Sequence, residues 1–92
     1  MNDEVEALLR SLGIGAWLLG YDELESLIVA VADGKQYELD DILRYQAARR
    51  AIGIAWRTNP EKMTDIMMMP LDRPPTPKKF VYAAADYLNG MR

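Results

Sequence analysis

The chain has 92 residues, of which 50% are hydrophobic, and a formal net charge of −3. This length fits a single helical domain over residues 1–92 with a modest apolar core. Cysteine and histidine are both missing, which excludes disulfides and removes the commonest general base and metal ligand. The longest apolar run is too short to span a membrane, and the acidic start is unlike a signal peptide. We therefore expect a cytoplasmic protein without a membrane partner.

The charge is divided unevenly along the chain. Residues 1–41 carry a net charge of −8, whereas residues 42–92 carry a net charge of +5. A small protein that is polarised in this way can present one end to an anionic partner. The alternative is that both halves are ordinary solvated surfaces, and the charge pattern alone leaves both interpretations open.

The first predicted helix covers residues 4–12, where leucines recur at helical spacing. Asp3 is placed to cap this helix, and Gly13 is placed to end it in a left-handed conformation. The segment GIGAWLLGY follows, and its three glycines predict a packed connector. Trp17 in this connector and Trp56 further on are expected to lie in the core, because tryptophan is highly buried on average.

The second predicted helix begins at Gly20–Tyr21 and ends at Gly34. Acidic residues at its start are favoured by the positive end of the helix dipole. The same stabilisation explains the acids Asp40–Asp41 at the start of the next predicted helix, so neither group is assigned a catalytic or metal-binding role. With no histidine or cysteine available, we expect a protein that is not an enzyme, has no small-molecule substrate and holds no metal or cofactor.

The third predicted helix, over residues 39–58, is the most informative part of the sequence. Four arginines lie along it: Arg44, Arg49, Arg50 and Arg57. No acidic residue occurs between Asp41 and Glu61, so this segment is basic within an otherwise acidic protein. Apolar residues recur along it every three or four positions. Gly53 interrupts the helix at a cost of about 1 kcal/mol relative to alanine, and we expect a close packing contact there.

Two interpretations of this basic helix remain open. In the first, its arginines contact phosphates or guanine in a duplex groove, and its glutamine contacts adenine. In the second, the arginines form a solvated face near the negative end of the helix dipole. The first interpretation predicts a nucleic-acid-binding site made of Arg44, Gln46, Arg49, Arg50 and Arg57.

Two further helices complete a predicted all-α bundle of about five helices. Asn59–Pro60 predicts the N-cap and first residue of the fourth helix, which Pro70 is expected to stop. After a proline-rich loop, Thr76–Pro77 repeats the same pattern, and the fifth helix is expected to run to about residue 89. In the run Met67–Met69, a core position for Met67 is favoured over an adaptable binding surface.

Three segments of the chain carry a family resemblance, in order. They are LLRSLGIGAWLLGYDELESLI, RRAIGIAWRTNPEKM and PPTPKKFVYAAADYL. Together they resemble the opening, the recognition-helix end and the closing segment of the C-terminal effector domain of the stage-zero sporulation response regulator family. This resemblance implies an all-helical response regulator effector domain with a helix-turn-helix, which binds duplex DNA and regulates transcription. In that family the domain follows a phosphorylatable receiver domain, which these residues do not include.

The resemblance also implies roles for individual residues. The family's DNA-contacting arginine corresponds to Arg49 and its neighbour to Arg50, whereas Gln46 stands where the family has another arginine. The segment ADGKQYELDD is shorter than the loop and first helix that precede the recognition helix in the family, so the helix-turn-helix is expected to be truncated. Asp40–Asp41 would repel phosphates at the start of the basic helix. The alternative is therefore a relative that has lost DNA binding and acts as a protein-interaction module, with a second copy or a related regulator as its partner.

Overall fold

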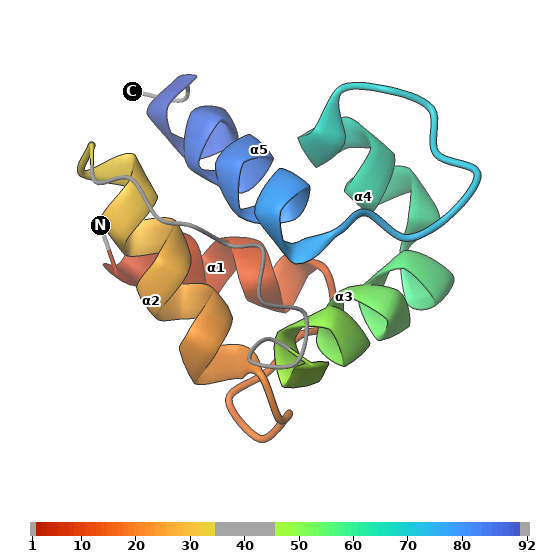
Figure 1. Cartoon of the computed structure of the whole chain (residues 1–92), viewed down its shortest axis with the longest axis horizontal. Helices are drawn as coiled ribbons and strands as arrows, with labels where there is room; N and C mark the ends of the chain where they lie inside the picture. Colours follow the sequence, from red (N-terminus) through yellow and green to blue (C-terminus); the bar gives the residue numbers. More distant parts are fainter. Residues whose placement is uncertain (1, 35–45, 91–92) are drawn as a thin grey trace.

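The computed structural model of the chain describes residues 2–34 and 46–90, and within these ranges it contains five α-helices and no strand (Figure 1). The helices are α1 (Asn2–Ser11), α2 (Tyr21–Ala32), α3 (Gln46–Thr58), α4 (Pro60–Met67) and α5 (Pro77–Gly90). The prediction of an all-α chain with about five helices is confirmed for the described residues. The first part of the predicted basic helix, including Arg44 and Asp40–Asp41, lies outside them.

Side chains from all five helices meet in one apolar core. The largest fully buried side chains include Leu9, Ile28, Ile52, Ile66 and Phe80, one from each helix. Burial of each such side chain contributes roughly 1.5–3 kcal/mol. The most extensive helix contact joins α2 to α5, while α1 packs on α2, and α3 touches α2, α4 and α5. Among the described residues, no polar or charged residue is buried.

The C-terminus of α1 is capped by backbone hydrogen bonds that depend on a glycine in the left-handed conformation. Gly13 has a φ of 85°, and its N–H donates to the carbonyl of Arg10 at 2.9 Å while the Ile14 N–H donates to the carbonyl of Leu9 at 2.9 Å. Leu9 and Ile14 are both fully buried, which completes the Schellman arrangement. The predicted role of Gly13 is confirmed. The predicted cap at Asp3 is wrong, because Asp3 lies inside the first turn of α1, where the helix dipole favours its charge.

Residues 12–20, the connector between α1 and α2, run along α3 in the opposite direction. At the first end, Asn59 Nδ2 donates to the carbonyl oxygen of Leu12 at 3.0 Å. At the other end, a Cβ on Gly20 would overlap the carbonyl group of Ala47. Because Asn59 follows α3 and Ala47 lies in its first turn, these two contacts fix the connector along the length of the helix. Asn59 occupies the predicted N-cap position of α4, but its side chain makes no capping bond. It donates to the Leu12 carbonyl instead, and we call this hydrogen bond the clamp at Asn59.

The prediction that Trp17 lies in the core is wrong. Trp17 is 80% exposed and Leu19 is 75% exposed, whereas Ile14 is fully buried and Leu18 packs partly against the core. The connector therefore reaches the core through Ile14 and Leu18, and its remaining large side chains point to solvent. Trp56, which was expected in the core as well, packs against it with part of its surface exposed.

The N-terminus of α5 agrees with the sequence-based prediction, whereas the C-terminus of α4 agrees with it only in part. Thr76 Oγ1 accepts a hydrogen bond from the Lys79 N–H at 3.3 Å, which confirms the predicted cap of α5. The helix α4 ends at Met67, before Pro70, because Met68 adopts a left-handed conformation with a φ of 58°. Met67 packs against the core, whereas Met68 and Met69 are exposed, in agreement with the favoured interpretation of the methionine run.

Gly53 is buried, but it does not make the predicted close packing contact with any residue that the structure describes. Among the described residues, a Cβ at this position would approach only Arg57 Nη1, at an ordinary contact distance of 3.8 Å. The situation at Gly20 is the opposite, since its φ of 97° disfavours a side chain and the Ala47 backbone leaves no room for one. The two glycines therefore respond differently to the same substitution.

We expect Gly53→Ala to stabilise the fold by about 0.5–1 kcal/mol, because alanine has the higher helix propensity. Gly20→Ala should destabilise it by at least about 2 kcal/mol, through an unfavourable φ and overlap with the backbone of α3. Urea unfolding followed by far-UV circular dichroism measures both changes. A stable Gly20→Ala variant would show that the connector is not clamped to α3 at this point.

A second prediction concerns Tyr21, the first residue of α2. Its buried hydroxyl donates to Glu25 Oε2 at 3.0 Å. Burial first, and then the hydrogen bond and charge of Glu25, raise the pKa of Tyr21 from 10.0 to about 12. The unfolded chain therefore loses this proton at a lower pH than the folded protein. This contribution to stability is complete below pH 10.0 and is lost as the pH rises toward about 12.

The measurement is the free energy of unfolding as a function of pH through this window, for the wild type and for Tyr21→Phe. We expect the wild type to lose more stability than the variant over this pH range. Equal losses in the two proteins would show that the Tyr21 proton is not retained on folding.

Candidate nucleic-acid interface

The helix α3 turns one face to the core and the opposite face to solvent. Its buried side chains are mostly small: Ala48, Ala51, Ile52 and Ala55. Thr58 at its end is exposed, and so are Gln46, Arg49, Arg50 and Arg57; these last four are called the arginine face. At 3.6 residues per turn, the centres of these two sets lie on opposite sides of the helix. The apolar contacts of one side therefore fix the direction in which the other side points.

The structure brings four of the five predicted site residues together on the arginine face. The fifth, Arg44, lies outside the described residues. Within the described part of the chain, none of the three arginines takes part in an ion pair or a hydrogen bond. Elsewhere, ion pairs join Arg10 to Glu6, Lys62 to Asp65 and Arg73 to Asp72. The arginine face therefore presents three guanidinium groups whose charges no described acid neutralises, which is the electrostatic requirement for an anionic partner.

Gly53 is buried, although its neighbours at helical spacing belong to the arginine face. Helical spacing places it between Arg49 and Arg57, each four residues away. The guanidinium of Arg57 lies over the Gly53 backbone, 3.8 Å from the position of a Cβ. The side chain of Arg57 therefore covers part of the helix backbone at Gly53.

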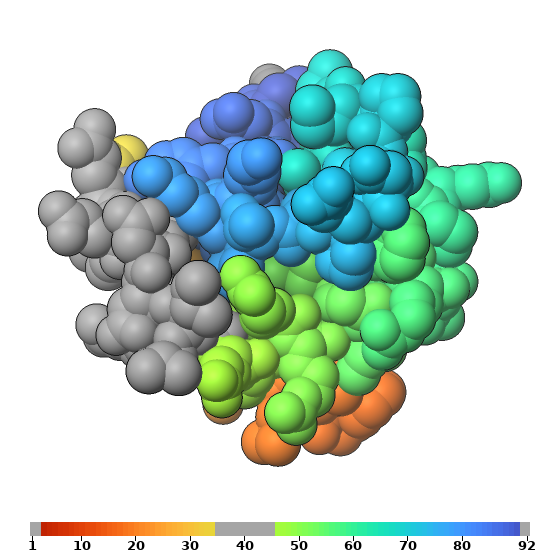
Figure 2. Space-filling view, turned by 45° about the vertical axis from the view of Figure 1, so that its right-hand side comes forward, coloured from red at the N-terminus to blue at the C-terminus, as the bar shows by residue number. Residues whose placement is uncertain are grey.

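Two other segments border the arginine face. Figure 2 shows α3 in green, with the connector in orange below it and the start of α5 in blue above it. The first turn of α5 adds Lys78 and Lys79, which are both exposed. The connector adds no charge, but it contains the exposed Trp17 and Leu19. Cationic and apolar groups therefore adjoin on one side of the molecule, while α1, α2 and α4 each carry acidic residues in their first turns.

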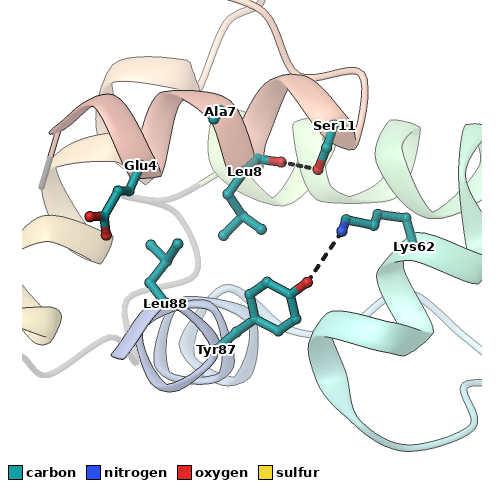
Figure 3. A pocket seen from close by; sticks show the side chains of 7 residues that line it. All are labelled: Glu4, Ala7, Leu8, Ser11, Lys62, Tyr87 and Leu88. Atoms are coloured by element: carbon teal, nitrogen blue, oxygen red, sulfur yellow. Dashed lines mark hydrogen bonds between the residues drawn. The ribbon is translucent and has the colours of Figure 1, made fainter. Parts of the chain in front are cut away.

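A separate cleft of about 370 Å³ opens between α1, α4 and α5 (Figure 3). Its lining consists of Glu4, Ala7, Leu8, Ser11, Lys62, Tyr87 and Leu88. Lys62 Nζ donates to the Tyr87 hydroxyl at 3.3 Å, and that hydroxyl lies 3.5 Å from Asp65 Oδ2. Because the ammonium of Lys62 is already held by Tyr87 and Asp65, the cleft offers a ligand mainly apolar contacts. The sequence did not predict this cleft, since its walls come from three helices that are distant along the chain.

The described residues include no group of three or more Asp or Glu side chains placed to hold a metal ion. In the same part of the chain, no helix has both the length and the apolar character needed to cross a membrane. No protein-family model matches the chain, and no curated protein or solved structure matches it significantly. The interpretation of the arginine face therefore depends on its own geometry and charge.

The orientation of this face depends on the clamp at Asn59, which gives a third prediction. Asn59→Ala removes the donor to the Leu12 carbonyl and should lower the free energy of unfolding by about 1 kcal/mol. Asn89→Ala is the control, because Asn89 is an exposed asparagine near the end of α5 and its loss should change stability by less than about 0.5 kcal/mol. Urea unfolding distinguishes the two variants. Equal stability of both would indicate that the Asn59 bond does not hold the connector.

Proposed function

We propose that the chain is a small DNA-binding transcriptional regulator that uses α3 as its recognition helix. The observation that carries this proposal is the arginine face, which is exposed opposite the core and has no acidic partner among the described residues. The resemblance to sporulation-regulator effector domains supports the same function. An effector-domain-like arrangement with a shortened helix-turn-helix is part of the proposal, and the shortened segment itself lies outside the described residues.

The dimensions of α3 are suited to the major groove of duplex DNA. Its 13 residues correspond to a length of about 20 Å, and the groove, about 12 Å wide, admits an α-helix. Arg49 and Arg57 are eight residues apart, which separates them by about 12 Å along the helix axis. We therefore assign Gln46, Arg49 and Arg50 to the bases and Arg57 to a phosphate at the edge of the groove.

The placement of the arginine face at the DNA is tested by the salt dependence of binding to a random duplex of about 20 base pairs, measured by fluorescence anisotropy. A random duplex offers the arginines no specific base, so all three should act on its phosphates, and log affinity should fall against log salt concentration with a slope of about −3. Arg49→Ala should weaken binding and make the slope shallower by about 1. The matched control is Arg10→Ala, which removes the same charge from α1, where Arg10 is paired with Glu6.

Two results would contradict the proposal. One is a wild-type protein that does not bind any duplex at about 50 mM salt, where phosphate contacts are strong. The other is an Arg10→Ala variant that weakens binding as much as Arg49→Ala, since binding would then follow net charge and not the arginine face. If Arg49→Ala instead abolishes self-association in sedimentation experiments, the arginine face contacts the acidic α1 and α2 of a second copy, and the protein is an interaction module.

A further inference from the structure

We infer that the connector is a second DNA-contacting element, which places the indole of Trp17 against the sugar-phosphate backbone beside the groove that α3 enters. This inference rests on the proposed function of α3. It assigns a role to an exposed tryptophan that neither the core nor the arginine face explains.

The first step is the position of the connector relative to the arginine face. Its end is held against Ala47 of α3, where a Cβ on Gly20 would overlap the Ala47 carbonyl. Ala47 precedes Arg50 by three residues, so the two lie on the same flank of the helix. The connector therefore borders the arginine face on the side of Arg50, and Figure 2 shows the two segments adjoining.

The second step is that Trp17 is held in place although it is exposed. The Leu18 N–H donates to the carbonyl of Gly15 at 3.0 Å, which closes a turn with Trp17 at its third position. The indole folds back over Gly15, where a Cβ would overlap its Nε1 atom. Below this turn, Ile14 is fully buried and anchors the connector. The 80% exposed indole therefore projects from a backbone turn that is already ordered, which lowers the entropy lost when the connector meets a partner.

The third step is the chemistry of the partner. The indole N–H can only donate a hydrogen bond, which suits a phosphate oxygen, and its ring can pack on a deoxyribose. A purely apolar partner that covered both the connector and the adjoining arginine face would have to bury guanidinium groups without a counter-charge, which is costly. Contacts from a second element to the DNA backbone fix a recognition helix in its groove. The connector lies where it can serve this purpose for α3.

Substitutions at Trp17 test the inference with the same anisotropy assay. Trp17→Ala should weaken binding to every duplex sequence by about tenfold, the effect expected for a lost hydrogen bond to a charged group. Trp17→Phe, which retains an aromatic ring, should have an intermediate effect. Neither change should alter the slope against salt, because the indole carries no charge. Since Trp17 is exposed, both variants should fold as stably as the wild type.

The matched control is Met68→Ala. Met68 is 83% exposed, and it follows the far end of α4, which leads away from α3 over eight residues or about 12 Å. Its loss removes a comparably exposed apolar side chain and should leave DNA binding unchanged. A tenfold loss in this control as well would overturn the inference, because exposed apolar area and not the place of Trp17 would then determine affinity.

Fluorescence gives a direct readout. The chain has two tryptophans, so Trp17 is the only one in a Trp56→Phe variant. Its emission should change when duplex is added, in parallel with the anisotropy. Binding without a change in emission, or an emission change with anionic phospholipid vesicles and none with duplex, would overturn the inference.

The outcomes separate this inference from the proposed function. If the wild type binds duplex and depends on Arg49, but Trp17→Ala binds equally well, the inference alone is wrong. If the wild type does not bind duplex at all, the proposed function is wrong and the inference is wrong with it. If Trp17→Ala abolishes self-association and leaves DNA affinity unchanged, the connector contacts a second copy and not DNA.

Discussion

The contact between the backbones of Gly20 and Ala47 is the constraint on which the arrangement of the candidate interface depends. At Gly20 the chain leaves the connector and begins α2, and its φ of 97° allows this turn to lie directly on the first turn of α3. The bond from Asn59 to Leu12 closes the other end of the same contact. Together these contacts set the position of α3 against the unit formed by α1, the connector and α2. A change at either end would therefore alter the direction of the arginine face, even though no arginine is involved.

The two sides of α3 separate the exposed arginine face from the residues that pack in the core. Three of the four buried side chains on its inner face are alanines, which allow the helix to lie close to its neighbours while contributing little apolar area of their own. Ile52 supplies the larger hydrophobic contact. The arginines on the outer side have no partners among the described residues, so their removal breaks no ion pair there. Their charges contribute to the surface potential, which acts on a partner at a distance.

Local sequence patterns were sufficient to predict the helices, because glycine, proline and apolar spacing act within a few residues. Gly13 and Thr76 ended and capped helices as expected, and the charge pattern identified the arginine face. The errors at Trp17 and Gly53 have a different cause. Which residues of a connector are buried depends on where it packs, and here that is set by contacts between residues 47 positions apart. The cleft beside Tyr87 was missed for the same reason, since three helices have to be assembled before it exists.

Two residues near the arginine face, Gly53 and Trp17, each lower the stability of the folded protein. A glycine inside a helix costs about 1 kcal/mol, and Gly53 makes no close contact among the described residues that would offset this cost. An 80% exposed tryptophan leaves a large apolar surface in water. Gly53 is four residues from both Arg49 and Arg57, and Trp17 lies on the connector that borders the arginine face. We propose that one anionic partner with both charged and apolar surface explains the arginines that have no acidic partner among the described residues and the exposed indole of the connector beside them. Duplex DNA, with its phosphates and its sugars, is such a partner.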